Sequence, residues 1–368
     1  MGTRWESTRH ARPVTSALLL LGCLLVAPAG HAQDPAKTSG ASAKSEPAIN
    51  TGSAKPDGRD TRPAVKNTSD AKPAKPAPAA DDWRRSKLPP DLAFAAYQRG
   101  RFITAFREAT KRIEAGGPHI AAAMTLIGEL YRDGLGFRQD PASAARWYAL
   151  AAKRGDAQAA FALGRAYLRG NGVKKDKAKA LTLFKEAASK GNSAALYNLG
   201  IAAIEPLEKN RPAGFEKAAE YFARSAYLGN LDAAYALATL YRKGLGVPQN
   251  DIKAASLLKE AADQHHLDSL TEYAIALFNG RGVKKDETEA ARYMIRAAWR
   301  NSPVAQNRLA RMFAAGRGVK RDRIQAMTWH IIARASGVKD KWLDSKLPLL
   351  TATQRKIVYE RVRKFARK

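Results

Sequence analysis

The sequence predicts an all-α fold, built as a solenoid of repeated helix–turn–helix units. The first observation is a glycine pair that recurs along the chain, as in "GRGVKKD". Its five copies begin at Gly134, Gly170, Gly244, Gly280 and Gly316, at spacings of 36, 74, 36 and 36 residues. The second observation is an alanine column with the same rhythm: Ala152, Ala188, Ala226, Ala262 and Ala298. A fixed period of roughly 20 to 50 residues is the signature of a repeat array.

One unit, residues 267–301, predicts a helix, a loop and a second helix. The first helix has apolar residues at the spacing of one helical face: Leu270, Tyr273, Ala274 and Leu277. Gly280 ends this helix in the left-handed conformation, and Asp286 caps the second helix, with Glu289 completing a capping box. The second helices also need a left-handed residue after their last turn, which predicts that conformation at Gly155, Gly191, Gly229, His265, Asn301 and Gly337.

The glycine pairs therefore mark turns between helices. A phosphate-binding loop is the alternative, but it requires a third glycine, or a Gly-Lys-Ser/Thr ending, after a strand. None of the five copies has these features.

The first unit carries a full repeat pattern: Ala123, Gly128, Tyr131, Gly134, Gly136, Asp140, Ala144, Trp147, Tyr148, Ala151, Ala152 and Gly155. This pattern resembles the Sel1-like repeat, a relative of the tetratricopeptide repeat. The resemblance implies a right-handed α-solenoid with six units over residues 119–336. Residues 83–118 resemble a tetratricopeptide-type hairpin in front, and residues 337–368 predict a basic C-terminal capping helix that begins with a capping box of Thr351 and Gln354.

The N-terminus predicts export. Residues 1–32 combine basic residues, an apolar stretch at 14–26 and small residues before a cleavage site after Ala32, as a secretory signal does. The expected location is the periplasm. Cys23, the single cysteine, leaves an alternative open, because "LLGC" loosely resembles a lipid-attachment site. Residues 33–82 contain seven prolines and no aromatic residue, which predicts a disordered linker.

Composition and motifs limit the function. The chain has 63 basic and 34 acidic residues, which suggests an anionic partner. Export argues against nucleic acid. Residues 339–368 contain ten basic and three acidic residues, which predicts either contact with an anionic polysaccharide or lipid, or a solvated face. The sequence has no H-E-x-x-H or G-x-S-x-G motif, and we expect no catalytic residue, metal site or cofactor.

Binding residues are expected on the first helices, whose concave face holds extended peptides in tetratricopeptide-type proteins. Positions are counted from the first glycine of each pair, with Pro206 standing in for it in the third unit. Positions −9, −5 and −2 share one stripe by helical geometry. The stripe contains these candidates: Phe161, Tyr197, Tyr235, Arg165, Arg242, Arg311 and Phe278. Aromatic and arginine side chains are typical of binding hot spots, and packing between units is the alternative. Glu272 and Arg308, both at position −8, are expected to form an ion pair between units.

The sequence thus predicts a non-enzymatic protein–protein interaction module with partners in the cell envelope. The chain also resembles alphaproteobacterial periplasmic Sel1-like proteins that repress exopolysaccharide production. This resemblance implies binding to the periplasmic domain of a sensor kinase. The alternative is a scaffold, anchored as a lipoprotein, for polysaccharide export or peptidoglycan assembly.

Overall fold

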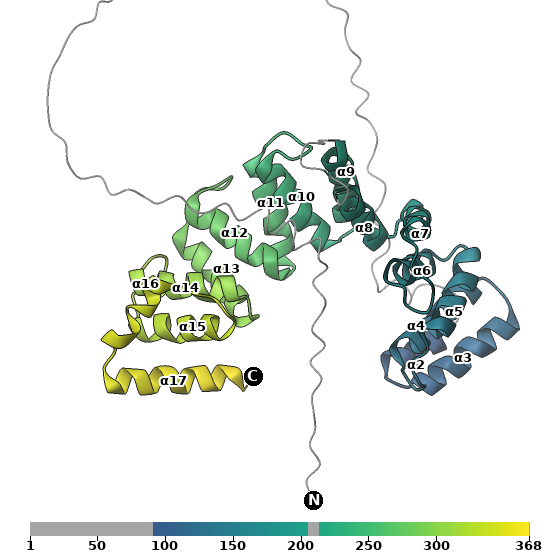
Figure 1. Cartoon of the computed structure of the whole chain (residues 1–368), viewed down its shortest axis with the longest axis horizontal. Helices are drawn as coiled ribbons and strands as arrows, with labels where there is room; N and C mark the ends of the chain where they lie inside the picture. Colours follow the sequence, from purple (N-terminus) through teal and green to yellow (C-terminus); the bar gives the residue numbers. More distant parts are fainter. Residues whose placement is uncertain (1–90, 205–212, 368) are drawn as a thin grey trace, which may run out of the picture. The chain divides into compact units, whose positions relative to one another are not determined.

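The structure is a computed structural model that describes residues 91–204 and 213–367, with helices and no strands among them (Figure 1). The expected signal and linker, the first residues of the expected hairpin and the loop of the third unit lie outside the described residues.

Each of the six units contains a first helix, called the A helix, and a second, the B helix. The pairs are α4 (Ile120–Asp133) with α5 (Pro141–Lys153), α6 (Ala157–Arg169) with α7 (Lys177–Ser189), α8 (Ser193–Ile204) with α9 (Ala213–Tyr227), α10 (Leu231–Lys243) with α11 (Asp251–Asp263), α12 (Leu267–Asn279) with α13 (Glu287–Trp299), and α14 (Pro303–Ala315) with α15 (Arg323–Ala335). The hairpin α2 (Leu92–Gln98) and α3 (Phe102–Ala115) precedes them, and α16 (Lys341–Asp344), the 3-10 helix η2 (Leu347–Leu349) and α17 (Ala352–Ala366) follow.

Each helix of the array packs against the next one along the chain. Every B helix contacts its own A helix and the A helix of the following unit, except α15 in the last unit, which packs against α17 instead. This arrangement confirms the predicted α-solenoid, because each unit buries its apolar face only against its neighbours.

The turn between the helices follows the predicted geometry in its main features. Gly280 ends α12 with φ 70°, and the Asp286 side chain accepts a hydrogen bond from the Glu289 N–H at 2.8 Å. The predicted capping box is wrong in one respect. The Glu289 carboxylate accepts from Arg292 Nη1 at 2.8 Å, and the Asp286 N–H donates to the Leu277 carbonyl instead. Arg292, one turn later on the same helix, therefore binds the Glu289 carboxylate that the capping box would need.

The second glycine of each pair sets the contact between units. A Cβ atom at Gly282 would lie 2.0 Å from the carbonyl oxygen of Asp251, at the start of the preceding B helix. The same backbone contact occurs at Gly172, Gly246 and Gly318. A side chain at this position would push the two units apart.

The predicted left-handed residues after the B helices are confirmed. His265 has φ 70° and Asn301 has φ 63°, and the glycines of the same column also have positive φ. Asparagine and histidine are among the few residues that tolerate this conformation, so both B helices end as their neighbours do.

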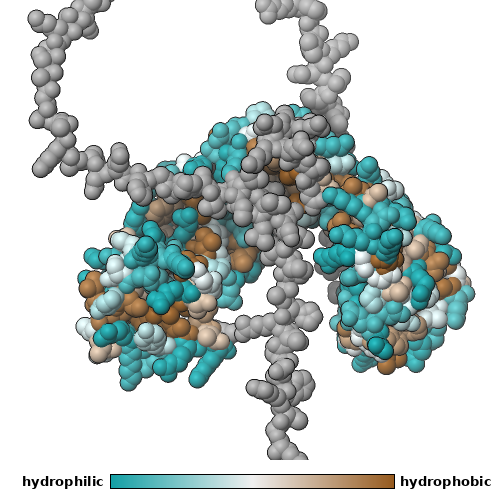
Figure 2. Space-filling model, in the orientation of Figure 1, coloured by the Kyte–Doolittle hydropathy of each residue, from teal (hydrophilic) through white to brown (hydrophobic). Residues whose placement is uncertain are grey.

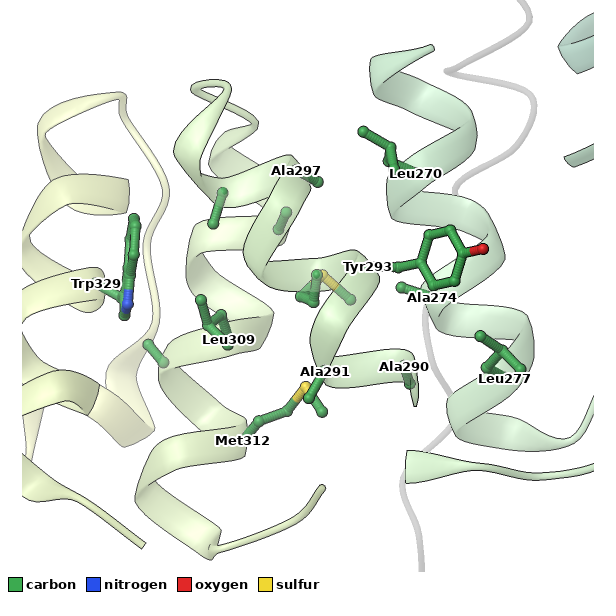
Figure 3. Close-up of a cluster of buried hydrophobic side chains, with 14 of the residues drawn as sticks. Leu270, Ala274, Leu277, Ala290, Ala291, Tyr293, Ala297, Leu309, Met312 and Trp329 are labelled. Carbon is green, nitrogen blue, oxygen red and sulfur yellow. The ribbon is translucent and has the colours of Figure 1, made fainter. Parts of the chain in front are cut away.

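Within each unit, a small residue of the A helix faces a large one of the B helix. In the second unit, Gly164 lies against Phe184, and a Cβ on Gly164 would be 2.7 Å from the ring. In the fifth unit, Ala274 takes the equivalent A-helix position and Met294 the B-helix position, and both are buried. Figure 3 shows this part of the core, where Leu270, Ala274 and Leu277 of α12 face α13. The apolar face predicted for α12 is buried.

The C-terminal helix α17 covers the last unit. Its Phe365 ring contacts Trp329 of α15 and Trp299 of α13, with ring centroids 5.6 and 5.4 Å apart. The capping box of Thr351 and Gln354 is present, as predicted. Among the described helices, none combines the length and apolar character needed to cross a bilayer. Apolar surface is nevertheless visible among hydrophilic side chains over the C-terminal helices, at the left of the space-filling view (Figure 2).

The contact between Gly164 and Phe184 generates a prediction about stability. Gly164→Ala should destabilise the fold by about 1–3 kcal/mol, because the new methyl group clashes with the ring and with the backbone of α7. The double variant Gly164→Ala with Phe184→Leu recreates the Ala238–Leu258 pairing of the fourth unit. It should recover part of that loss in urea unfolding. A double variant that unfolds more easily than Gly164→Ala would contradict the account.

Candidate functional site

A groove recurs between neighbouring units, and we call it the inter-unit groove. Its walls are the end of one A helix, the following B helix and the next A helix. It leaves a cavity between units 1 and 2 and between units 5 and 6, and only a small residual space between units 4 and 5. Equivalent repeat positions line the groove in each of these three pairs of units. Positions −2 and +14 come from the earlier unit of the pair, and positions −8, −5 and −1 come from the later unit. Because the positions are equivalent and the residues are not, each groove has its own chemistry.

The groove between units 5 and 6 is the largest apolar one, with a volume of about 440 Å³. Its walls include these apolar side chains: Ile275, Phe278, Met294, Met312 and Trp342. Three arginines, Arg308, Arg311 and Arg317, also line it.

Two of these arginines are held by carboxylates and rings. Arg317 donates to Glu287 at 2.5 and 3.2 Å, and its guanidinium carbon lies 4.1 Å from the centroid of the Phe278 ring. Arg317, together with Lys285, lowers the pKa of Glu287 to about 2. These contacts fix the Arg317 head group against the apolar wall.

Arg311 is held in the same way by the C-terminal cap. It donates to both carboxylate oxygens of Asp340, at 2.6 and 2.9 Å, and lies 5.6 Å from the Trp342 ring centroid. Burial raises the pKa of Asp340, but the hydrogen bonds from Arg311 and Asn307 outweigh it and leave that pKa below its usual value. The sequence predicted Phe278 and Arg311 as binding residues, and the structure brings both into this groove.

The expected ion pair between Glu272 and Arg308 is wrong. Glu272 forms its ion pair with Arg242 across the groove between units 4 and 5. A side chain at position −8 points toward position −2 of the preceding unit, so Glu272 contacts Arg242. Arg308, at the same position of the sixth unit, lines the groove between units 5 and 6. Among the described residues, Arg308 is exposed and has no carboxylate partner.

The pair of Arg242 and Glu272 nearly fills its groove. The remaining cavity is about 20 Å³, less than the space of a side chain. The predicted binding residue Arg242 is therefore engaged within the protein, and its groove is closed.

The groove between units 1 and 2 is open, with a volume of about 260 Å³. The predicted Arg165 lines it, together with Arg132, Arg169 and Tyr148. Four alanines form much of the remaining wall: Ala144, Ala145, Ala162 and Ala166.

The predicted aromatic column does not line these three grooves. Phe161 is only 8% exposed and packs against Phe184 of its own unit, with ring centroids 5.7 Å apart. Tyr197 packs in the same way against Phe222 at 5.6 Å. Tyr235 packs against His266 at 5.7 Å. Position −9 turns toward the neighbouring helices, so its rings fill space between them.

The hydroxyls of this column are held away from water. Burial raises the pKa of Tyr197 above its usual value and raises that of Tyr235 to about 12.

Several groove residues were not among the binding residues predicted from the sequence, notably Tyr148, Arg308, Arg317 and Trp342. Tyr148 is at position +14, on the B helix, Arg308 at −8 and Arg317 at +1, in the turn. A helical wheel of the A helix alone does not show that these positions lie next to −5 and −2. Within the described part of the chain, no group of three or more His, Cys, Asp or Glu side chains is placed to hold a metal ion.

The exchanged ion pair generates a prediction. In a double-mutant cycle on urea unfolding, Arg242→Ala and Glu272→Ala should be coupled by about 0.5–1 kcal/mol, because the two groups are partly shielded from water. The matched cycle of Glu272→Ala and Arg308→Ala should show a coupling near zero. Equal couplings in the two cycles would disprove the assignment.

The Sel1 repeat family model matches the chain at residues 121–156, 157–192, 193–230, 231–266, 267–299 and 303–338, more than half of its length. A Sel1 repeat protein from Oxalobacter formigenes is 26% identical, with a TM-score of 0.60, over 66% of this chain and 98% of that one. The protective antigen c5321 of uropathogenic Escherichia coli, which displays an SLR fold, is 27% identical, with a TM-score of 0.46, over 75% of this chain and 68% of that one. No curated protein matches the chain. From its six matched repeats, the chain belongs to the Sel1 repeat family.

Proposed function

We propose that the chain is a periplasmic interaction module whose groove between units 5 and 6 binds a segment of a cell-envelope protein. Sel1 repeats form a non-catalytic protein-interaction fold, so binding to a protein is the starting point. The signal features of residues 1–32 support export as the setting.

The observation that carries the proposal is an apolar cavity lined by arginines. Its volume of about 440 Å³ lies within the range of roughly 300–1,000 Å³ of known binding pockets. Arg311 and Arg317 are already fixed by Asp340 and Glu287, so binding needs little ordering of side chains.

The third arginine indicates the chemistry of the bound segment. Arg308 is exposed and has no acidic partner in the described chain, so it is free to pair with a carboxylate of the ligand. A segment with a large apolar side chain beside an acidic one suits this groove. Tryptophan and arginine are the residues most enriched in binding hot spots, and the groove contains both.

For the partner, we propose the periplasmic domain of a sensor kinase, with exopolysaccharide signalling as the output. The support is the resemblance to alphaproteobacterial periplasmic Sel1-like proteins. The second candidate is a scaffold for polysaccharide export or peptidoglycan assembly. The mature N-terminus distinguishes them: cleavage after Ala32 favours the regulator, and lipidation of Cys23 favours the scaffold.

The basic C-terminal helix supports a second contact, with an anionic polysaccharide or lipid. Six exposed cations of this segment have no carboxylate partner within the described residues: Arg355, Lys356, Arg361, Arg363, Lys364 and Arg367. If they form such a contact, binding of the chain to an anionic polymer or vesicle should weaken steeply as salt increases.

The proposal predicts where a partner can be trapped. A photo-crosslinking residue at Ala315, which lines the groove and is exposed, should give an adduct with one envelope protein. Phe278→Ala should weaken binding of that purified partner by about tenfold or more, as the loss of a buried hot spot does. The control is a crosslinker at Leu150, an exposed residue of a B helix. Equal adducts from both positions, or unchanged binding in a folded Phe278→Ala variant, would contradict the proposal.

A further inference from the structure

Tyr148 carries a hydroxyl that its packing does not require. It occupies position +14 of the first unit, where later units have Phe184, Leu258, Met294 and His330. The third unit is two residues longer at this point, and Phe222 takes the equivalent place on Gly200. Its ring packs on Gly128 of the A helix as Phe184 packs on Gly164. Tyr148 is only 2% exposed, and within the described chain its hydroxyl has no hydrogen-bond partner. A buried hydroxyl without a partner is unfavourable, so the site gains by receiving an acceptor.

Tyr148 lines the groove between units 1 and 2, and Arg132 and Arg165 lie close enough to its covered hydroxyl to act on the pKa of that group. Arg132 is neutralised by Asp133, through two hydrogen bonds of 2.8 and 2.6 Å. Arg165 is half-buried, lies against the Phe161 ring at 5.7 Å and has no carboxylate partner in the described chain. Arg169 is exposed and likewise has no carboxylate partner there.

The charge of Arg165 is therefore not compensated. Burial lowers its pKa, and the nearby Arg169 and Arg132 lower it further. Glu129 is the other acidic side chain close to Tyr148, and Gln158 is its hydrogen-bond partner. Arg165, a half-buried cation, and Tyr148, whose hydroxyl has no acceptor among the described residues, therefore line the same cavity of about 260 Å³.

In the groove between units 4 and 5, a carboxylate of the protein itself occupies the space next to the arginine. There the carboxylate of Glu272, at position −8, crosses the groove and pairs with Arg242. In the groove between units 1 and 2, position −8 is Ala162, which leaves both space and positive charge. The missing group is a carboxylate.

We propose that the groove between units 1 and 2 binds the carboxylate of an acidic side chain in a peptide segment. The Arg165 guanidinium donates hydrogen bonds to it, and Arg169 adds positive charge at the rim. The Tyr148 hydroxyl donates a further hydrogen bond when the carboxylate displaces the side chains that cover it. The alanine walls give room for one short acidic side chain. That the carboxylate belongs to a peptide rests on the proposed function of the chain as a protein-binding module.

The test is a peptide-display selection on the full mature chain, run beside the Tyr148→Phe variant. The wild-type chain should select peptides with a fixed Asp or Glu. For one such peptide, Tyr148→Phe should weaken binding about tenfold and Arg165→Gln at least tenfold, as should replacement of the acidic residue by its amide. Tyr148→Phe should leave the melting temperature unchanged or higher, because phenylalanine already occupies the equivalent position in the next two units.

A second variant closes the groove from inside. Ala162→Glu copies position −8 of the fifth unit and should abolish binding of the acidic peptide, while Ala162→Gln, of equal size, should weaken it less. Leu150→Ala, on an exposed face of α5 outside the groove, should leave this peptide's affinity unchanged.

The outcomes separate the two proposals. Acidic peptides that bind equally well to Tyr148→Phe would overturn the carboxylate site and leave the protein-binding function intact. Selection without any acidic consensus would overturn the site as well. Competition by alginate or inorganic phosphate, with no bound peptide, would overturn the peptide as ligand. Failure of every peptide and of the crosslinked partner would instead remove the proposed function.

Discussion

The structure depends on close contacts at positions that carry no side chain or a very small one. The second glycine of each pair lets the turn touch the backbone of the preceding B helix, as Gly282 does at Asp251. Inside each unit, Gly164 or Ala274 lets the two helices approach over a large B-helix side chain. These contacts fix the distance between neighbouring units, and the inter-unit groove follows from that distance.

Because the groove is a product of the repeat, its chemistry is decided by a few positions. Position −8 is the most informative. Glutamate there closes the groove between units 4 and 5, alanine leaves the groove between units 1 and 2 open and cationic, and arginine leaves a free cation beside the apolar groove between units 5 and 6. One backbone therefore presents a closed, a polar and an apolar groove on equivalent faces, which suits a protein that recognises an extended partner.

The sequence was sufficient for the period, the helix ends and the left-handed residues, because these depend on local backbone chemistry. It also found Phe278, Arg311 and Arg165, since positions −5 and −2 lie on one helical stripe. It placed Phe161, Tyr197 and Tyr235 in the same stripe as binding residues, but a helical wheel does not show which ring a neighbouring helix covers. The Arg242–Glu272 pair and Trp342 required the reach of long side chains across units and the position of the C-terminal cap.

The most direct test of the account is hydrogen–deuterium exchange of the protein, alone and bound to a partner identified by crosslinking from Ala315. Recognition through the groove between units 5 and 6 predicts slower exchange in the segments that line it, at residues 275–282 and 308–318, with α17 unchanged. Protection confined to α17 would show that the partner binds elsewhere, and the grooves would then be structural features of the repeat.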